Sequence, residues 1–285
     1  MSAAPAVRPA KGAGSGEADE GERLSKHVAQ MLGCSRREAE QYIEGGWVRL
    51  DGKVVEVPQQ RVLNQMVTVD PEASLLALGE VTLILHKPPN VLDSVQDDPA
   101  LAAAPPGPPA VRGRQARAPA MRFARELLTA TNHSPHDASD QRPLLRHFKQ
   151  LQASVPLETA ASGLVVFTQD WRVQRKLLED MAQMEHELML EVRGEVKAEV
   201  LIPIERALRD PRQRLPVAKI SVSSASEARS ILRLAVKGAH PGLAAYLGEL
   251  AGLEIQALRR IRLGRVSLGD VAPGQWRYLA TFERF

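Results

Sequence analysis

Basic side chains are the groups of this sequence whose types and spacing most clearly suggest chemistry. Arginine supplies most of the 37 basic residues, and the formal net charge is +3 with a pI of about 9.1. The guanidinium group is a planar fork of N–H donors that matches phosphate oxygens and stacks on bases, so this excess suits a nucleic-acid partner. A GC-rich coding sequence is an alternative source of the same excess.

Several of these basic residues lie near the N-terminus, on two short helical patterns. The first pattern begins at Arg23, has apolar residues at helical spacing on one face, and is predicted to end at Gly33. In the second, Ser35 and Glu38 have the spacing of a capping box. The polar side of both helices carries Arg23, Lys26, His27, Arg36 and Arg37. These side chains predict a phosphate-binding surface, and an ordinary solvated basic face is the alternative.

A β-hairpin is expected directly after the second helix, which should run to about Glu44. Residues 47–50 and 54–57 resemble strands on either side of Asp51-Gly52, a typical two-residue hairpin turn. A further strand at 66–69 could complete a small sheet. The two helices and the hairpin therefore predict a small domain over residues 23–72. Residues 1–22, rich in Ala, Gly, Pro and Ser, are expected to be a disordered tail.

The sequence of this small domain resembles a known module. The run R-L-S-K-H-V-A-Q-M-L-G-C-S-R-R-E-A-E-Q-Y-I-E-G-G-W-V-R-L-D-G-K-V-V resembles the S-four-type RNA-binding domain. That resemblance implies binding of structured RNA through backbone contacts and shape. The RNA-binding residues expected here are Arg23, Lys26, Arg36, Arg37 and Lys53.

Composition limits the other kinds of site and the compartment. Cys34 is the only cysteine, so an internal disulfide and a cysteine metal cluster are excluded and a reduced compartment is expected. The spacing of His133, His136 and His147 fits no common ligand pattern, so no metal site is predicted. The chain has no apolar run of about 18 residues and no signal-peptide pattern. A cytoplasmic protein that does not contact membranes is therefore expected.

The remaining chain, residues 76–285, mixes strand and helix patterns. An apolar run at 81–85 leads into His86-Lys87-Pro88, and a basic, proline-rich insertion is expected at about 95–145. Later strands are predicted at 164–167, 188–192, 261–268 and 276–282, and helices after Asp170 and at 225–236 and 241–251. This mixture predicts an α+β fold in which a small α-α-β domain precedes a domain with a mixed or antiparallel sheet.

The order of features in the large domain resembles the RsuA and RluF branch of the bacterial pseudouridine synthases, which carry an S-four-type domain at the N-terminus. The segment E-T-A-A-S-G-L-V-V-F-T-Q-D-W-R-V-Q-R-K-L resembles their central motif, and L-R-R-I-R-L-G-R-V-S-L-G-D-V-A-P-G-Q-W-R-Y-L resembles their C-terminal block. His86-Lys87-Pro88 corresponds to their Asn-Lys-Pro strand end. The resemblance implies the family fold and makes Lys87 a further expected RNA-binding residue.

The resemblance also implies a reaction. The family breaks the C1′–N1 glycosidic bond of a flipped-out uridine, turns the base and rejoins it through C5, without a cofactor or metal. An aspartate in an R-L-D motif acts on the sugar with an arginine beside it. A tyrosine stacks on the base, and further basic groups hold the RNA. Structured RNA, in the first place ribosomal RNA, is the implied partner of a chain expected to be a monomer.

This sequence departs from the family at those positions. The R-L-D motif has become Pro156-Leu157-Glu158, so Glu158 is the candidate catalytic residue, with one methylene more than aspartate. The stacking tyrosine corresponds to Leu188, and the arginine-rich helix corresponds to residues 239–246, which contain no arginine. Displacing a reacting group by about 1 Å can lower a rate by roughly 10²-fold.

Three functional hypotheses follow. The first is an RNA-binding relative of the pseudouridine synthases with weak or no catalytic activity. The second is an active synthase in which Glu158 replaces the aspartate and Lys87 or Arg172 supplies positive charge. The third is a non-enzymatic ribosome-associated or scaffold protein that uses the former cleft for another ligand.

Overall fold

The computed structural model describes residues 21–75, 78–93, 122–139 and 141–285. The described residues form two compact units, one within 1–79 together with 144–146 and the other within 80–143 and 147–285. Most of the predicted tail and residues 95–121 of the predicted insertion lie outside the described residues. None of the described helices is long and apolar enough to cross a membrane.

The two helices of the N-terminal unit begin and end where the sequence predicts. Helix α1 (Leu24–Leu32) ends at Gly33, whose φ of 64° is left-handed and suits a residue without a Cβ. Helix α2 (Arg36–Glu44) is preceded by the predicted capping box. The Glu38 N–H donates to Ser35 Oγ (3.2 Å), and the Ser35 N–H donates to the Glu38 carboxylate (2.8 Å).

Short strands complete this unit. Strands β3 (Lys53–Val54), β2 (Val48–Leu50) and β5 (Val67–Val69) form one antiparallel sheet in that order, and β1 (Glu22–Arg23) pairs with β4 (Arg61–Val62). The strand predicted at 54–57 is therefore shorter than expected. The predicted hairpin and the strand near residue 66 are confirmed. A core of buried residues from both helices, β2 and β4 holds the unit together: Leu24, Val28, Ala39, Ile43, Val48, Leu50 and Val62.

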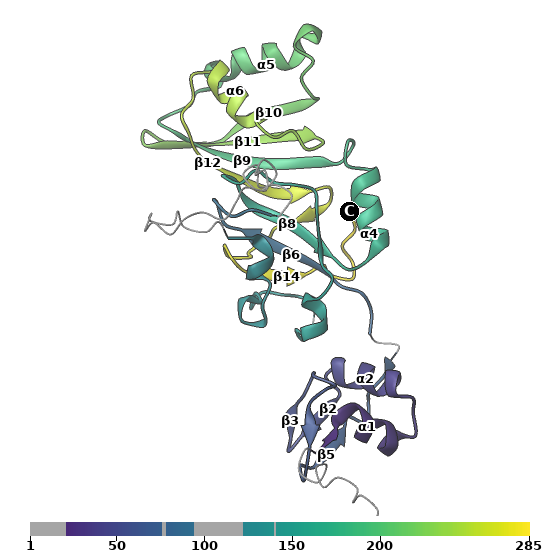
Figure 1. The fold of residues 1–285 in the computed structure, drawn as a ribbon. Helices are drawn as coiled ribbons and strands as arrows, with labels where there is room; N and C mark the ends of the chain where they lie inside the picture. Colours follow the sequence, from purple (N-terminus) through teal and green to yellow (C-terminus); the bar gives the residue numbers. More distant parts are fainter. Residues whose placement is uncertain (1–20, 76–77, 94–121, 140) are drawn as a thin grey trace, which may run out of the picture. The chain divides into compact units, whose positions relative to one another are not determined.

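A mixed sheet, antiparallel except where β8 meets β12, organises the C-terminal unit (Figure 1). Its strand order is β10-β11-β9-β12-β8-β6-β14, with β7 added on β8 and β13 on β12. The strands are β6 (Thr82–Lys87), β7 (Gln152–Ser154), β8 (Ser162–Thr168), β9 (Glu185–Arg193), β10 (Ala218–Ala225), β11 (Arg229–Lys237), β12 (Ile255–Leu263), β13 (Val266–Ser267) and β14 (Trp276–Tyr278). With the helices that cover it, this sheet makes the fold α+β, as predicted.

Among the described residues of this unit, three α-helices pack on the sheet. Helices α5 (Ile202–Arg209) and α6 (Leu243–Leu250) bury apolar side chains against β9 and β11. Figure 1 shows both helices on the same side of β10 and β11. Helix α4 (Trp171–Glu179), capped by Asp170 as predicted, packs with β6 and β8 in a separate cluster. The described part of the chain also contains 3-10 segments at Ala124–Leu127, Ala130–Asn132, Leu145–Phe148, Ala198–Leu201 and Pro211–Gln213.

The helix predicted at 225–236 is wrong, because most of this stretch is strand β11. Its side chains alternate: Ser230, Leu232, Leu234 and Val236 are buried, whereas Arg229 and Arg233 are exposed. Pairing with β10 and β9 along nearly its whole length satisfies the backbone that a helix would otherwise satisfy internally. The strand predicted at 276–282 is also shorter and ends at Tyr278.

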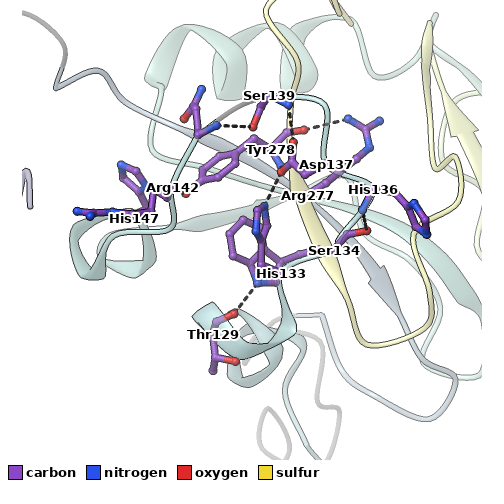
Figure 2. A network of polar contacts seen from close by, with 12 residues as sticks. Thr129, His133, Ser134, His136, Asp137, Ser139, Arg142, His147, Arg277 and Tyr278 are labelled. Atoms are coloured by element: carbon purple, nitrogen blue, oxygen red, sulfur yellow. Dashed lines mark hydrogen bonds and ion pairs between the residues drawn. The ribbon is translucent and has the colours of Figure 1, made fainter. Parts of the chain in front are cut away.

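Residues 122–139, which belong to the described part of the predicted insertion, are packed against the sheet. Ala124 and Leu128 are buried in one core cluster with Trp276 and Tyr278. Figure 2 shows the polar contacts that fix this segment to β14. The Asp137 carboxylate accepts from the Tyr278 N–H (2.8 Å) and is bonded to His133 Nε2 (2.7 Å), so His133 is engaged with Asp137.

Candidate active site

Glu158, the candidate catalytic residue of the sequence, lies on the loop between β7 and β8. Its Oε1 accepts a hydrogen bond from the backbone N–H of Gly242 (2.9 Å), the residue that precedes α6. A carboxylate at this position interacts favourably with the positive end of the helix dipole. Glu158 therefore links its loop to the beginning of α6, and one of its oxygens already has a structural partner.

A buried lysine holds the same loop. Lys87, at the end of β6, is fully buried, and its Nζ donates to the carbonyl oxygens of Val91 (2.7 Å), Ala161 (2.7 Å), Thr159 (3.1 Å) and Pro88 (3.3 Å). Burial lowers the pKa of Lys87 to about 8, against the opposing effect of Asp93. The expectation that Lys87 binds RNA is therefore wrong for this conformation, because main-chain carbonyls surround its amine.

A buried arginine holds the other end of the loop. Arg260 on β12 is 1% exposed. Its guanidinium donates to the carbonyl oxygens of Leu164 (2.8 Å), Pro156 (3.0 Å) and Val155 (3.0 Å). Burial lowers the pKa of Arg260 to about 10, and the nearby Asp93 carboxylate opposes that shift. The positive charge nearest the former R-L-D motif thus comes from a distant strand.

Asp93 completes this group of buried charges. Its side chain is 4% exposed and accepts from the Leu157 N–H (2.6 Å), one residue before Glu158. One carboxylate and two cations therefore hold the backbone on both sides of Glu158. Because buried charges are stable only when they are paired and hydrogen-bonded, this arrangement fixes the loop conformation strongly.

Gly163 allows β8 to approach β12 closely beside Arg260. A Cβ on Gly163 would lie 2.2 Å from the Arg260 carbonyl oxygen and 2.6 Å from its backbone nitrogen, and the φ of Gly163 is 114°. No other residue fits this position, which explains the glycine between Ser162 and Leu164 in β8.

The cavity next to Glu158 is small. Its volume is about 30 Å³, which is enough for roughly one water molecule, whereas ligand pockets measure roughly 300–1,000 Å³. Leu188, where the family has its stacking tyrosine, lies in its wall together with Glu158 and Arg260. The other walls come from 156–157, 239–241 and neighbouring side chains of the sheet. This space cannot accept a nucleobase in the described conformation.

Glu158 also borders a larger cavity of about 350 Å³. Alanines 160, 161, 244, 245 and 257 form much of its lining, and Glu249 adds a second carboxylate. Among the described residues that line it, none is a lysine or arginine. An RNA phosphate would therefore meet apolar side chains, two carboxylates and the Gln256 amide there, with no cation among the described lining residues.

Arg172, the other cation expected to serve the site, lies on α4, where its guanidinium is 5.4 Å from the centre of the Trp171 ring. It lines neither of the two cavities that Glu158 borders. Arg260 is the charged residue that sequence reasoning missed. Its signal was present in the L-R-R-I-R strand, where alternation requires one of two adjacent arginines to face the interior.

His186, beside Leu188 on β9, is buried, and its Nε2 has no hydrogen-bond partner among the described residues. Burial, assisted by Arg260 and His240, lowers the pKa of His186 to about 3. The folded protein thus keeps His186 neutral, whereas the unfolded chain binds a proton below about pH 6.5. The contribution that the neutral His186 makes to the free energy of unfolding should therefore be fully present above pH 6.5. It should be lost as the pH falls toward 3.

We expect His186→Leu to reduce this acid sensitivity. The free energy of unfolding of the native protein should fall by about 1–2 kcal/mol more than that of the variant between pH 7 and pH 5. Urea unfolding at the two pH values measures the difference, and His136→Gln, at an exposed histidine, is the control. Parallel pH dependences for the native protein and His186→Leu would contradict this account.

The five basic residues expected to bind RNA in the N-terminal unit are all exposed. Lys26 pairs with Glu22 (2.9 Å) and Arg36 with Glu40 (3.1 Å), both at exposed positions where such pairs contribute little stability. Arg23, Arg37 and Lys53 form no ion pair among the described residues. All five side chains are therefore accessible to a phosphate.

Comparisons with known proteins cover both units. An S4 domain model matches residues 22–67. An uncharacterized RNA pseudouridine synthase of Aquifex aeolicus is 22% identical over 92% of this chain and 94% of its own length. The ribosomal large subunit pseudouridine synthase B of Bacillus subtilis is 24% identical over 92% and 93%, respectively. A crystal structure of a pseudouridylate synthase matches 90% of this chain and 96% of its own at 15% identity, with a TM-score of 0.49.

The sequence relatives extend through both units and agree with the order of motifs along the chain. The chain is therefore a relative of the RsuA-type RNA pseudouridine synthases, with an S4 domain at its N-terminus.

Proposed function

We propose that this chain is an RNA-binding protein of the pseudouridine synthase family with weak or no catalytic activity. Its partner is structured RNA, in the first place ribosomal RNA, and it works as a monomer in the cytoplasm without a cofactor. The observation that carries the proposal is the cavity of about 30 Å³ that Glu158 lines together with Leu188 and Arg260, which is too small for a base.

The state of Glu158 supports the same conclusion. A carboxylate that attacks or deprotonates a sugar needs free access to it, yet Glu158 accepts from the Gly242 N–H. Arg260 directs its three hydrogen bonds to main-chain carbonyls, and Leu188 replaces a planar ring. These contacts stabilise the fold of the loop and give no preferential stabilisation to a transition state.

An active synthase that uses Glu158 is the second candidate. The observation in its favour is that Glu158 also borders the cavity of about 350 Å³, which is large enough for a nucleoside. Arg260, which also lines the small cavity, supplies a positive charge near the loop. On this alternative, the bond from Glu158 to Gly242 breaks when RNA binds.

A pseudouridine map of ribosomal RNA separates the two candidates. Cells without this protein should show the same modified sites as cells with it, and cells that carry Glu158→Ala should also match. A site that disappears on deletion and in the Glu158→Ala strain would establish catalysis. RNA cross-linked to the protein in the same cells reports binding independently of the map.

We expect the double variant Arg36→Ala, Arg37→Ala to bind RNA more weakly and with less salt dependence. Each phosphate contact contributes roughly 0.7–0.9 to the slope of log affinity against log salt, so the slope should fall by about one to two. Titration of ribosomal RNA at several salt concentrations measures it. Arg206→Ala with Arg209→Ala, which removes the same charge from α5, is the control; equal slopes in the two variants would exclude phosphate contact at α2.

A further inference from the structure

The sheet of the C-terminal unit has a face that no described helix covers near β9, β10 and β11. On β9 and β11, alternate residues such as Leu190 and Leu234 point into the core under α5 and α6. The residues between them point the other way, because successive side chains of a strand lie on opposite faces. We name the outward residues of β9–β12 the open face.

The open face is rich in cations. Cross-strand register places Lys219, Ala235, Glu187 and Arg262 in one row, and Ser221, Arg233, Met189 and Arg259 in the next. Lys237 lies opposite Glu185, and Ile231 opposite Glu191. The described residues of the open face include these six cations: Lys219, Arg229, Arg233, Lys237, Arg259 and Arg262. Three carboxylates on the same face partly offset their charge: Glu185, Glu187 and Glu191.

Two carboxylates of the open face are less exposed than the cations with which they pair, so the surface is more positive than a count of six cations against three carboxylates implies. The Glu187 side chain is 9% exposed, whereas that of Arg233, its ion-pair partner, is 56% exposed. Glu191 is 33% exposed and its partner Arg229 is 62% exposed. The carboxylates of Glu187 and Glu191 thus lie near the sheet and orient guanidinium groups whose remaining N–H donors face solvent. Glu185 is the exception, because its side chain is 45% exposed and that of its partner Arg262 is 31% exposed.

Three cations of the open face have no carboxylate partner among the described residues. Lys219, Lys237 and Arg259 are all exposed and take part in none of the ion pairs of the unit. Arg259 stands next to Arg260 on β12, so the two arginines serve opposite faces of the sheet. One is buried under the Glu158 loop, and the other is free to meet a ligand.

We propose that the open face is a second RNA-contact surface, which binds the phosphodiester backbone of structured RNA. This inference rests on the proposed RNA-binding function and adds a site on the sheet face opposite the Glu158 loop. The face extends roughly 14 Å across four strands. The outward positions of β9–β12 hold no aromatic side chain and few apolar ones, which disfavours base stacking and an ordinary protein interface. Contacts to phosphates position RNA without reading its sequence.

The test compares two triple variants of the full chain. Lys219→Gln, Lys237→Gln and Arg259→Gln together remove the unpaired cations of the open face. Lys197→Gln, Arg212→Gln and Arg214→Gln remove the same charge from exposed positions outside the strands. Binding of a double-stranded RNA hairpin of arbitrary sequence and of ribosomal RNA is measured between about 0.05 and 0.2 M salt.

We expect the open-face variant to bind both RNAs at least about tenfold more weakly and to lose roughly two to three from the salt slope, and the control to change little. In the native protein, bound RNA should protect Lys219 and Lys237 from acetylation and leave Lys197 reactive. Equal slopes for the two triple variants, or no protection, would overturn the proposal. If the native protein binds neither RNA, the proposed RNA-binding function is refuted. If only the Arg36→Ala, Arg37→Ala variant loses binding, that function stands and the open face is not an RNA-contact surface.

Discussion

Arg260→Met should destabilise the C-terminal unit severely, lowering the free energy of unfolding by roughly 3–5 kcal/mol. Methionine fills similar space but cannot donate to the Val155, Pro156 and Leu164 carbonyl oxygens. These acceptors would stay buried without their donors. The Asp93 carboxylate would also lose a nearby positive charge. Urea unfolding at neutral pH measures the change.

The neighbouring arginine provides the control. Arg259→Met removes the same charge from the same strand at an exposed position, so its effect should stay within about 0.5 kcal/mol. Arg260→Lys should fall between the two, because an ammonium group keeps the charge but cannot span three carbonyls in a planar fork. If Arg260→Met and Arg259→Met unfold alike, the buried guanidinium does not stabilise the loop.

Local signals explain why the N-terminal unit could be predicted from the sequence. The Ser35–Glu38 capping box, the glycine after α1 and the Asp51-Gly52 turn each act within a few residues of themselves. The same reasoning located α4 from its Asp170 cap. Where the interactions that form an element lie inside that element, sequence patterns suffice.

Long-range pairing explains where prediction failed. Residues 225–236 contain alanine and leucine at spacings that also fit a helix, and only the partners β10 and β9 make them a strand.

The candidate site also depends on contacts between residues far apart in the sequence. Glu158 could be found from a motif, but the burial of Lys87 and Arg260 depends on strands that meet across 74 and 104 residues of chain. Charged side chains are rarely buried, so a sequence alone predicts that Lys87 and Arg260 are exposed.

The second large effect concerns catalysis. Purified protein should convert no measurable uridine to pseudouridine in ribosomal or transfer RNA, at least about 10³-fold below the Bacillus subtilis relative tested in parallel. A reacting carboxylate, a stacking platform and RNA-holding cations stabilise one transition state, so their losses compound. Here Glu158 is engaged with Gly242, Leu188 offers no planar ring, and residues 239–246 supply no arginine. Nucleoside analysis of RNA incubated with the protein measures the conversion.

Glu158→Asp should not restore activity. This variant distinguishes two explanations of inactivity, a misplaced carboxylate alone and the loss of several groups around it. If the extra methylene were the sole defect, aspartate would return the reacting oxygens to the family's position and turnover would rise. Leu188 and Pro156, which line the small cavity, are unchanged by that substitution, so a base still has no place between the carboxylate and Leu188. Loss of the bond to Gly242 should instead loosen the start of α6 slightly. Robust turnover by the native protein that Glu158→Ala abolishes would place the chain among the working synthases, with the cavity of about 350 Å³ as the site of the nucleoside.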